Sequence, residues 1–245
     1  MNHAYATLLA GALALGCADT STESAGEPPG IGDSTSDTDG VGGNTGPTID
    51  ATVRVLDAMS GSGMADVTVE NAAEDTATTD SSGSATLSVP ADDTFSILLQ
   101  RSDAIDHLLF GPTGTEDFSY VTFMATQVLV SGVSAMLGAT IEEGTGVVVV
   151  GIDYDNLAPA VGASADLDGE HGEPWVLTST GASFGDTILP GAMGMVAFSN
   201  VQPGDVNVSV TPPDGADCTA FPGGGEMPAA PVQADLVTVV TFHCR

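Results

Sequence analysis

The sequence predicts a mainly β protein. We expect two small antiparallel β-sandwich modules joined by a short helical segment, preceded by an apolar leader and a disordered linker. Three observations predict this class. Polar and apolar residues alternate in several short runs, turns rich in Gly, Ser and Asp separate these runs, and a stretch near the N-terminus has almost no apolar residue. The chain has 245 residues, which leaves room for two small domains after the leader and linker.

The charge balance excludes two classes of partner. The chain has 33 Asp and Glu residues against 3 Lys and Arg, which gives a formal net charge of −30 at pH 7. Binding of nucleic acid requires clustered cations, so we expect no nucleic-acid partner. An anionic membrane surface is excluded as an electrostatic partner by the same argument. Any membrane attachment is therefore expected to come from a covalent lipid.

The leader is an apolar run over residues 4–16 that ends in small residues directly before Cys17. It is too short to span a bilayer as a stable helix. The run Leu13-Ala-Leu-Gly-Cys17 resembles the lipobox of a bacterial lipoprotein signal peptide, although the leucine is displaced by one position and no Lys or Arg precedes the run. The alternative is an ordinary secretory leader in which Cys17 is incidental.

The lipoprotein resemblance implies a signal peptide over residues 1–16 and an acyl anchor, such as palmitate, on Cys17. It places the protein in the cell envelope, facing the periplasm or the exterior. By analogy, Ala18 after the cysteine favours the outer membrane over retention in the inner one. Residues 18–48 are nearly all Ser, Thr, Asp, Glu, Gly and Pro and cannot bury enough surface to fold, so residues 17–48 are predicted to be a lipidated, disordered linker.

The first module is expected over residues 49–102. Ile49, Ala51, Val53 and Val55 alternate with polar residues, as in a half-buried strand. Further short strands follow, separated by turns at residues 60–63 and 80–83, and one of these strands stops at Pro90. This spacing is typical of a small antiparallel sandwich.

Three motifs connect this module with a known family. The stretches Val53-Arg-Val-Leu-Asp57, Gly63-Met-Ala-Asp-Val-Thr-Val69 and Thr79-Asp-Ser-Ser-Gly-Ser-Ala-Thr-Leu-Ser-Val-Pro90 resemble the carboxypeptidase regulatory-like, transthyretin-like β-sandwich. Residues 144–245 look like a more divergent second copy, on the stretches 146–152, 161–167, 194–198 and 200–204. The resemblance implies non-catalytic accessory or adhesion-like modules, with no active site to carry over and no cofactor.

The segment over residues 103–143 is expected to connect the modules through a helix. Within it, residues 118–141 contain no charged residue, and apolar side chains recur at helical spacing. A transmembrane span is the alternative. Polar residues interrupt the stretch, and it lacks flanking cations and an aromatic belt, so a helix packed between the two sandwiches is the preferred interpretation.

Cys218 and Cys244 are the other two cysteines of the chain. In an exported protein, such a pair is most simply a disulfide. We expect it to clamp the last strand to the preceding loop, and its reduction to destabilise the second module while leaving the first nearly unchanged.

The second module contains one possible catalytic motif. Gly181-Ala-Ser183-Phe-Gly185 fits the G-x-S-x-G pattern, and Asp205 and His243 follow in the order that a hydrolase requires. The pattern needs a strand, a sharp turn and a helix, whereas the residues after Ser183 continue as strand and loop. We therefore predict that the chain is not an enzyme.

One possible metal site lies in an acidic, glycine-containing loop. Asp166, Asp168 and Glu170, with His171 and Glu173 nearby, offer ligands that calcium prefers, but their spacing is not that of an EF-hand. In so acidic a chain a solvated loop is the simpler interpretation, and no metal is assigned. His107 is isolated and is predicted to be structural.

Taken together, these features predict a non-catalytic cell-envelope lipoprotein that presents β-sandwich modules for binding, adhesion or structural support. Its partners would be the membrane, through the lipid, and a protein or carbohydrate ligand of the envelope that the sequence does not name. The alternatives are a secreted serine hydrolase that uses Ser183 and a calcium-dependent adhesive module.

Overall fold

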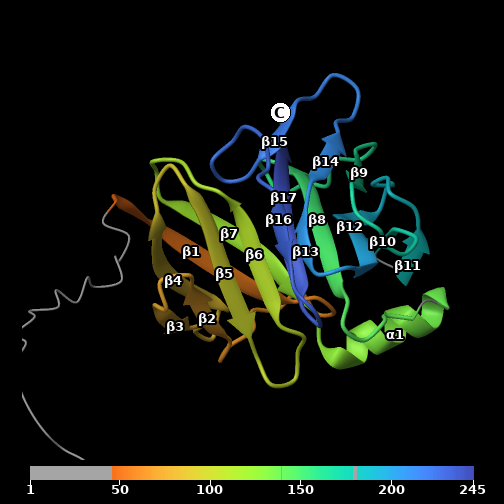
Figure 1. The fold of residues 1–245 in the computed structure, drawn as a ribbon, viewed down its shortest axis with the longest axis horizontal. Helices are drawn as coiled ribbons and strands as arrows, with labels where there is room; N and C mark the ends of the chain where they lie inside the picture. The colour runs from red at the N-terminus through yellow and green to blue at the C-terminus, as the bar shows by residue number, and fades with distance from the viewer. Residues whose placement is uncertain (1–45, 139, 179–180) are drawn as a thin grey trace, which may run out of the picture. The chain divides into compact units, whose positions relative to one another are not determined.

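The computed structural model describes residues 46–138, 140–178 and 181–245, and these residues are mainly β (Figure 1). The predicted signal peptide, Cys17 and nearly all of the predicted linker lie outside the described residues. In chain order the elements are β1 (Thr48–Asp57), β2 (Thr68–Asn71), β3 (Thr76–Thr78), β4 (Ser84–Pro90), β5 (Thr94–Gln100), β6 (His107–Pro112), β7 (Phe118–Met124), α1 (Gln127–Leu137), β8 (Gly146–Tyr154), β9 (Ser164–Leu167), β10 (Trp175–Thr178), β11 (Gly181–Phe184), β12 (Ala192–Val201), β13 (Gly204–Val206), β14 (Val208–Thr211), β15 (Cys218–Ala220), β16 (Ala230–Val232) and β17 (Val237–Cys244).

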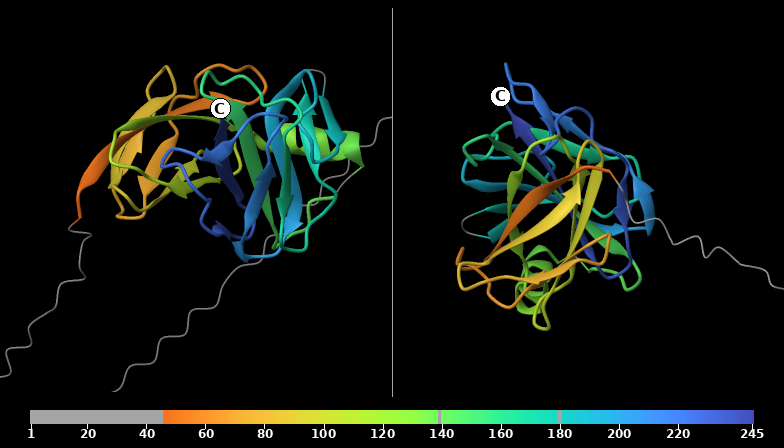
Figure 2. Two further views of the ribbon diagram at one scale, coloured as in Figure 1. Left: turned by 90° about the horizontal axis from the view of Figure 1, so that it is seen from above. Right: turned by 90° about the vertical axis from the view of Figure 1, so that its left-hand side faces the viewer.

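One large sheet runs through the whole described body. Its strand order is β11-β10-β12-β8-β17-β6-β5-β2-β3, and β15 also pairs with β17. A three-stranded sheet in the order β4-β1-β7 forms a second layer at the end where β1 begins (Figure 2). Two small strand pairs, β13-β16 and β14-β9, complete the other end. The predicted mainly β class is confirmed.

Two hydrophobic cores lie along this sheet. The first is shared by the sheet β4-β1-β7 and by strands β2, β5 and β6, and the second is built on β8, β9, β12, β14 and β16. Strand β17 contributes to both. Its Val237 and Val239 lie in the first core, and its Val240 and Phe242 lie in the second. Because side chains alternate between the two faces of a strand, one central strand connects both cores.

The connecting segment differs from the sequence-based expectation. The helix covers Gln127–Leu137, whereas His107–Pro112 and Phe118–Met124 are strands β6 and β7. The reason is visible in β7, where the buried residues Tyr120, Thr122 and Met124 alternate with more exposed ones and the strand pairs in parallel with β1. The first core therefore extends past the predicted boundary at residue 102.

Helix α1 has defined ends. The hydroxyl of Thr126 accepts a hydrogen bond from the backbone N–H of Leu129 at 3.3 Å, and Gly138 ends the helix with a φ of 65°, in the left-handed region that glycine adopts at low cost. Among the described residues, no helix has the length and apolar character needed to cross a bilayer.

A buried tyrosine links the small sheet to β17. The hydroxyls of Tyr120 and Thr241 are 2.6 Å apart, and the Tyr120 ring packs near the rings of Phe95 and Phe221. Burial raises the pKa of Tyr120 well above its ordinary value, so the phenol stays protonated.

We expect Tyr120→Phe to lower the free energy of unfolding by about 1 kcal/mol, because it leaves the Thr241 hydroxyl without its partner. Urea unfolding measures the change. Tyr154→Phe is the matched control, since the Tyr154 hydroxyl makes no hydrogen bond to any described residue. Equal stability of the two variants would contradict a contribution from this hydrogen bond.

Candidate functional site

The structure does not assemble the possible catalytic residues. Ser183 lies on β11 at the edge of the large sheet, opposite Val176, while His243 lies on β17. Strands β10, β12 and β8 separate them, which corresponds to about 19 Å at the usual spacing of neighbouring strands. Asp205 lies on β13, where it pairs with Pro231. These three side chains therefore do not form a charge-relay triad, and β11 is not followed by the helix that a nucleophile elbow needs.

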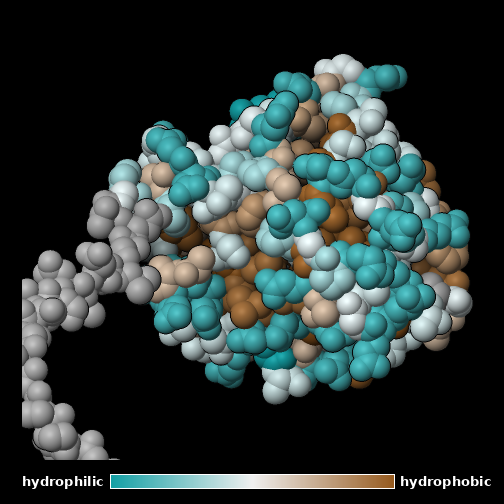
Figure 3. All heavy atoms as spheres, in the orientation of Figure 1, coloured by the Kyte–Doolittle hydropathy of each residue, from teal (hydrophilic) through white to brown (hydrophobic). Residues whose placement is uncertain are grey.

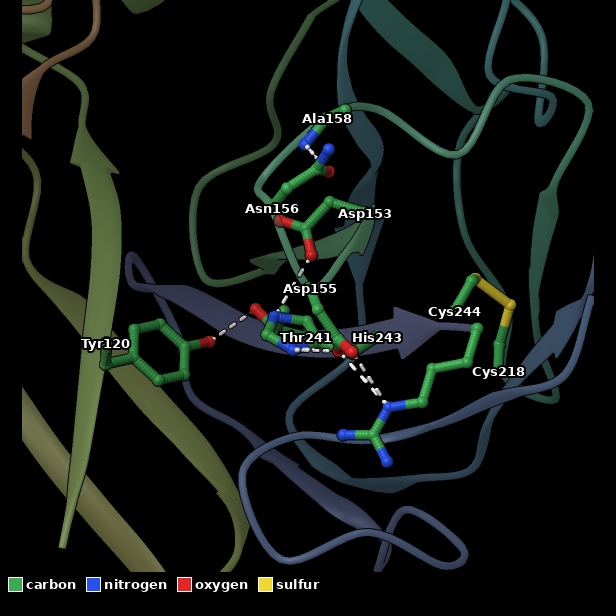
Figure 4. A network of polar contacts seen from close by, with 10 residues as sticks. Tyr120, Asp153, Asp155, Asn156, Ala158, Cys218, Thr241, His243 and Cys244 are labelled. Carbon is green, nitrogen blue, oxygen red and sulfur yellow. Dashed lines mark hydrogen bonds and ion pairs between the residues drawn. A yellow bond between two sulfur atoms is a disulfide. The ribbon is translucent and has the colours of Figure 1, made fainter.

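His243 belongs instead to a polar cluster at the end of β17 (Figure 4). The parallel register of β17 and β8 sets it beside Asp153, with 3.1 Å between His243 Nε2 and Asp153 Oδ1. Its Nδ1 is 3.6 Å from Asp155 Oδ1, and Arg245 Nε is 3.0 Å from Asp155 Oδ2. The imidazole also stacks on the ring of Phe221, with centroids 4.0 Å apart.

The disulfide adjoins this cluster. Cys218 on β15 lies opposite Cys244 on β17, and the two sulfurs are bonded (Figure 4). The predicted pairing of these cysteines is therefore present in the structure. Together with the contact between His243 and Asp153, it ties the end of β17 to the strands that lie beside it there, β8 and β15. This arrangement is that of a structural clamp.

The possible calcium ligands lie on and after β9. Asp166 lies on β9 opposite Ser209, and Glu170 is exposed. Asp168 is already engaged, because its two carboxylate oxygens accept hydrogen bonds from the backbone N–H and the side-chain amide of Asn207 at 2.8 and 2.6 Å. These hydrogen bonds lower the pKa of Asp168. Across the described ranges, no three acidic, His or Cys side chains are grouped in a way that could hold a metal ion.

A cavity of about 470 Å³ lies between α1 and the large sheet. Its floor is one face of the sheet, on which the lining residues of β8, β10, β12 and β17 are all odd-numbered. The opposite face of β8 and β12 packs into the second core. The principal floor residues are Val147, Val149, Trp175, Leu177, Met195, Ala197, Val237 and Val239.

The cavity exists because two different elements cover this face. Over β5, β6 and β17 it packs against the sheet β4-β1-β7 in the first core. Over β8, β10 and β12 the cover is α1, which lines the cavity with Leu129, Val130, Val133 and Leu137. Away from α1, which lies at the lower right of this view, hydrophobic side chains also reach the surface near the middle of the body, framed by polar ones (Figure 3). One helix covers less area than a sheet, which leaves space beneath it.

Two buried polar residues line this otherwise apolar space. His107 is 3% exposed, and its Nδ1 lies 2.8 Å from the carbonyl oxygen of Ile105. A carbonyl can only accept a hydrogen bond, so Nδ1 carries the proton, and Nε2 of the neutral ring is an acceptor. Burial lowers the pKa of His107 to about 4, which keeps the ring neutral. Thr122 on β7 is 4% exposed and also lines the cavity.

Both residues line the cavity, and each has one polar atom to spare. Neither His107 Nε2 nor Thr122 Oγ1 has a hydrogen-bond partner among the described residues. Neither belongs to the fully enclosed polar atoms that lack a partner, so each keeps some accessible surface. From the sequence, His107 is predicted to be structural, and this cavity is not predicted. The available signal was the run Val147–Val150, which is apolar on both faces and so indicates a strand covered on both sides.

No family model and no curated protein matches this chain. Among solved structures, it is similar to the minor pilin GBS52 of Streptococcus agalactiae, with 14% identity, 80% of this chain and 94% of that chain covered, and a TM-score of 0.27. It is also similar to the shaft pilin SpaA of Lactobacillus rhamnosus GG, with 11% identity and a TM-score of 0.23. This match covers 81% of this chain and 97% of that chain. The Bacillus anthracis TIE protein gives 10% identity and a TM-score of 0.26. The match covers 81% of this chain but 34% of that protein. At these TM-scores the similarities carry no argument about function.

Proposed function

We propose that this protein is a non-catalytic lipoprotein of the cell envelope, in which a lipid on Cys17 and the linker over residues 17–48 hold the β body away from the membrane. The observation that carries the proposal is the disulfide between Cys218 and Cys244. Disulfides persist in oxidising compartments and are rare in the cytosol. This bond supports export, and the lipobox-like run that ends at Cys17 supports a lipid anchor on that residue.

The arrangement of the possible catalytic residues supports a non-catalytic role. Ser183, Asp205 and His243 lie on three separate strand pairs, and His243 is engaged with Asp153 and Asp155. We expect Ser183→Ala to leave any ester or peptide turnover unchanged when both proteins are screened on the same substrates. Turnover that disappears with this substitution would favour the serine hydrolase instead.

The charge of the body supports presentation away from the membrane surface. Two of the three basic residues are paired with aspartates, Arg101 with Asp103 at 2.8 Å and Arg245 with Asp155 at 3.0 Å. The remaining acidic surface repels anionic lipid headgroups and other copies of the chain. A protein or carbohydrate of the envelope is the proposed class of macromolecular partner. A calcium-dependent adhesive role is less favoured, since both carboxylate oxygens of Asp168 already accept hydrogen bonds from Asn207.

The anchor is tested by fractionation. We expect the wild-type chain to sediment with membranes and to be released by detergent, and Cys17→Ser to appear in the soluble fraction, because the thiol is the acylation site. A double variant, Cys218→Ser with Cys244→Ser, is the matched control that keeps the anchor and should remain with membranes. If Cys17→Ser still sediments with membranes, the anchor proposal is wrong.

A further inference from the structure

We propose that the cavity between α1 and the large sheet is a binding site for a neutral, mostly apolar small molecule that carries one hydrogen-bond donor, as a medium-chain alcohol does. This site is independent of the anchor and of the proposed envelope role. Its evidence is the size of the cavity, the character of its walls, its two free polar atoms and the sign of the surrounding charge.

The size and the walls fit a small apolar ligand. A volume of about 470 Å³ lies within the range of small-molecule sites in proteins. At ~30 Å³ for each water-sized unit, it holds about 15 non-hydrogen atoms. Valines of β8 and β17 form the middle of the floor, Trp175 and Met195 extend it, and α1 forms the roof. An apolar molecule that filled this space would remove its own apolar surface and that of the cavity walls from water.

The two polar residues determine which polar group the ligand must carry. His107 presents Nε2 as an acceptor, because its Nδ1 proton is donated to Ile105. The Thr122 hydroxyl can donate or accept. A ligand hydroxyl that donates to Nε2 would satisfy a buried acceptor that the protein leaves unpaired, which an apolar ligand could not do.

The charge around the cavity excludes an anionic ligand. No Lys or Arg is among the residues that line it, and Asp235 is the acidic residue at its wall. The chain as a whole has a formal charge of −30 at pH 7. A carboxylate such as that of a fatty acid would therefore enter without a counter-ion and against the field of the protein. A neutral alcohol meets neither penalty.

Helix α1 provides a route of entry. Val133 is its one residue that is buried, and Val128 on its outer side is 79% exposed. On the side of β11, the helix is contacted by the backbone N–H of Ala182, which lies 3.5 Å from the sulfur of Met136. A ligand can thus reach the cavity by displacement of one lightly held helix, while the sheet hydrogen bonds stay intact.

Trp175 makes binding directly observable, because it is the single tryptophan of the chain and lines the cavity. Its fluorescence would be followed near neutral pH during titration with three ligands of similar length: decanol, methyl nonyl ether and decanoate. We expect a saturable change with decanol, about tenfold weaker binding of the ether, which lacks the donor, and no binding of decanoate. No saturable change with decanol, or equal affinity for decanol and the ether, would overturn the proposal.

Three variants locate the site. Ala197→Phe, which fills the cavity from β12, should abolish the fluorescence change. Thr122→Val is nearly isosteric, and His107→Leu removes the Nε2 acceptor without supplying another. At least one of them should weaken decanol binding about tenfold relative to the ether. Thr86→Val, on the exposed face of β4, is the matched control and should bind as the wild type does.

Melting curves of each variant establish that it is folded before titration. If His107→Leu does not fold, the comparison of decanol with the ether in the wild-type protein still tests the hydrogen-bond donor. Undiminished decanol binding by a folded Ala197→Phe variant would place the ligand elsewhere and contradict the proposed site.

Discussion

Reduction of the disulfide between Cys218 and Cys244 should lower the free energy of unfolding of the whole described body by about 3 kcal/mol, on the chain-entropy model. The two cysteines are 26 residues apart in the sequence, and Cys244 is 1% exposed at the end of β17. The sequence alone predicts an effect confined to the second module. The structure changes that expectation, because Val237 and Val239 of the same strand lie in the first core.

Urea unfolding with and without reductant measures this effect. Trp175 reports on the large sheet near the second core, and far-ultraviolet circular dichroism reports on all strands. Both signals should shift together to lower urea concentration. The variant in which Cys218 and Cys244 are both replaced by Ala should resemble the reduced protein and ignore the reductant. An early transition of Trp175, with most of the dichroism unchanged, would show that the two cores unfold separately.

Acidification should lower the free energy of unfolding through His107 by about 3 kcal/mol in total. Its pKa in the folded protein is about 4, against 6.5 for an ordinary histidine, because burial disfavours the charged ring. Between these two values the unfolded chain binds a proton that the folded protein does not. Stability from this residue is therefore fully present above pH 6.5 and is lost as the pH falls towards about 4.

The comparison with His107→Gln isolates this contribution, since the carboxylates titrate in both proteins. The difference in unfolding free energy between wild type and variant should fall steadily from pH 6.5 to about 4. His171→Gln is the matched control. Like His107, His171 has its Nδ1 close to a backbone carbonyl oxygen, at 2.7 Å, but it is partly exposed. His171→Gln should therefore lose stability on acidification as the wild type does. A pH-independent difference between wild type and His107→Gln would contradict a neutral, buried His107.

Local sequence patterns were sufficient for several elements. The alternation from Ile49 to Val55 corresponds to β1, and the strand that was expected to stop at Pro90 corresponds to β4. The disulfide followed from the number of cysteines and the expected compartment. In each case the information lies within a few residues or in one pair of side chains.

Local patterns were misleading where the spacing of a helix and the alternation of a strand overlap. Residues 118–141 carry apolar side chains at helical spacing, but Tyr120, Thr122 and Met124 also alternate, and this part pairs with β1 as a strand. Tertiary pairing decided between the two patterns. Helix α1 forms where the alternation ends, after Thr126 provides the cap.

Two features could not be predicted from the sequence: the cavity, and the connection of the two cores through strand β17. Both depend on long-range parallel pairing. Strand β17 pairs with β6, in register Val237 to His107, and with β8, in register Val237 to Val147. No local pattern specifies that the last strand inserts between β6, which belongs to the predicted connecting segment, and β8, which belongs to the second predicted module. His107 is therefore isolated in the sequence, yet it lines a space shared with Trp175 and with α1.

The central claim, an exported lipoprotein with a disulfide-closed β body, is tested most directly by the intact mass and N-terminal peptide of the protein purified from membranes without reductant. The account predicts a mature chain that begins at Cys17, carries acyl chains on that residue and lacks two hydrogens because Cys218 and Cys244 are bonded. An unmodified Cys17, or native Cys218 and Cys244 that both react with an alkylating reagent, would contradict it.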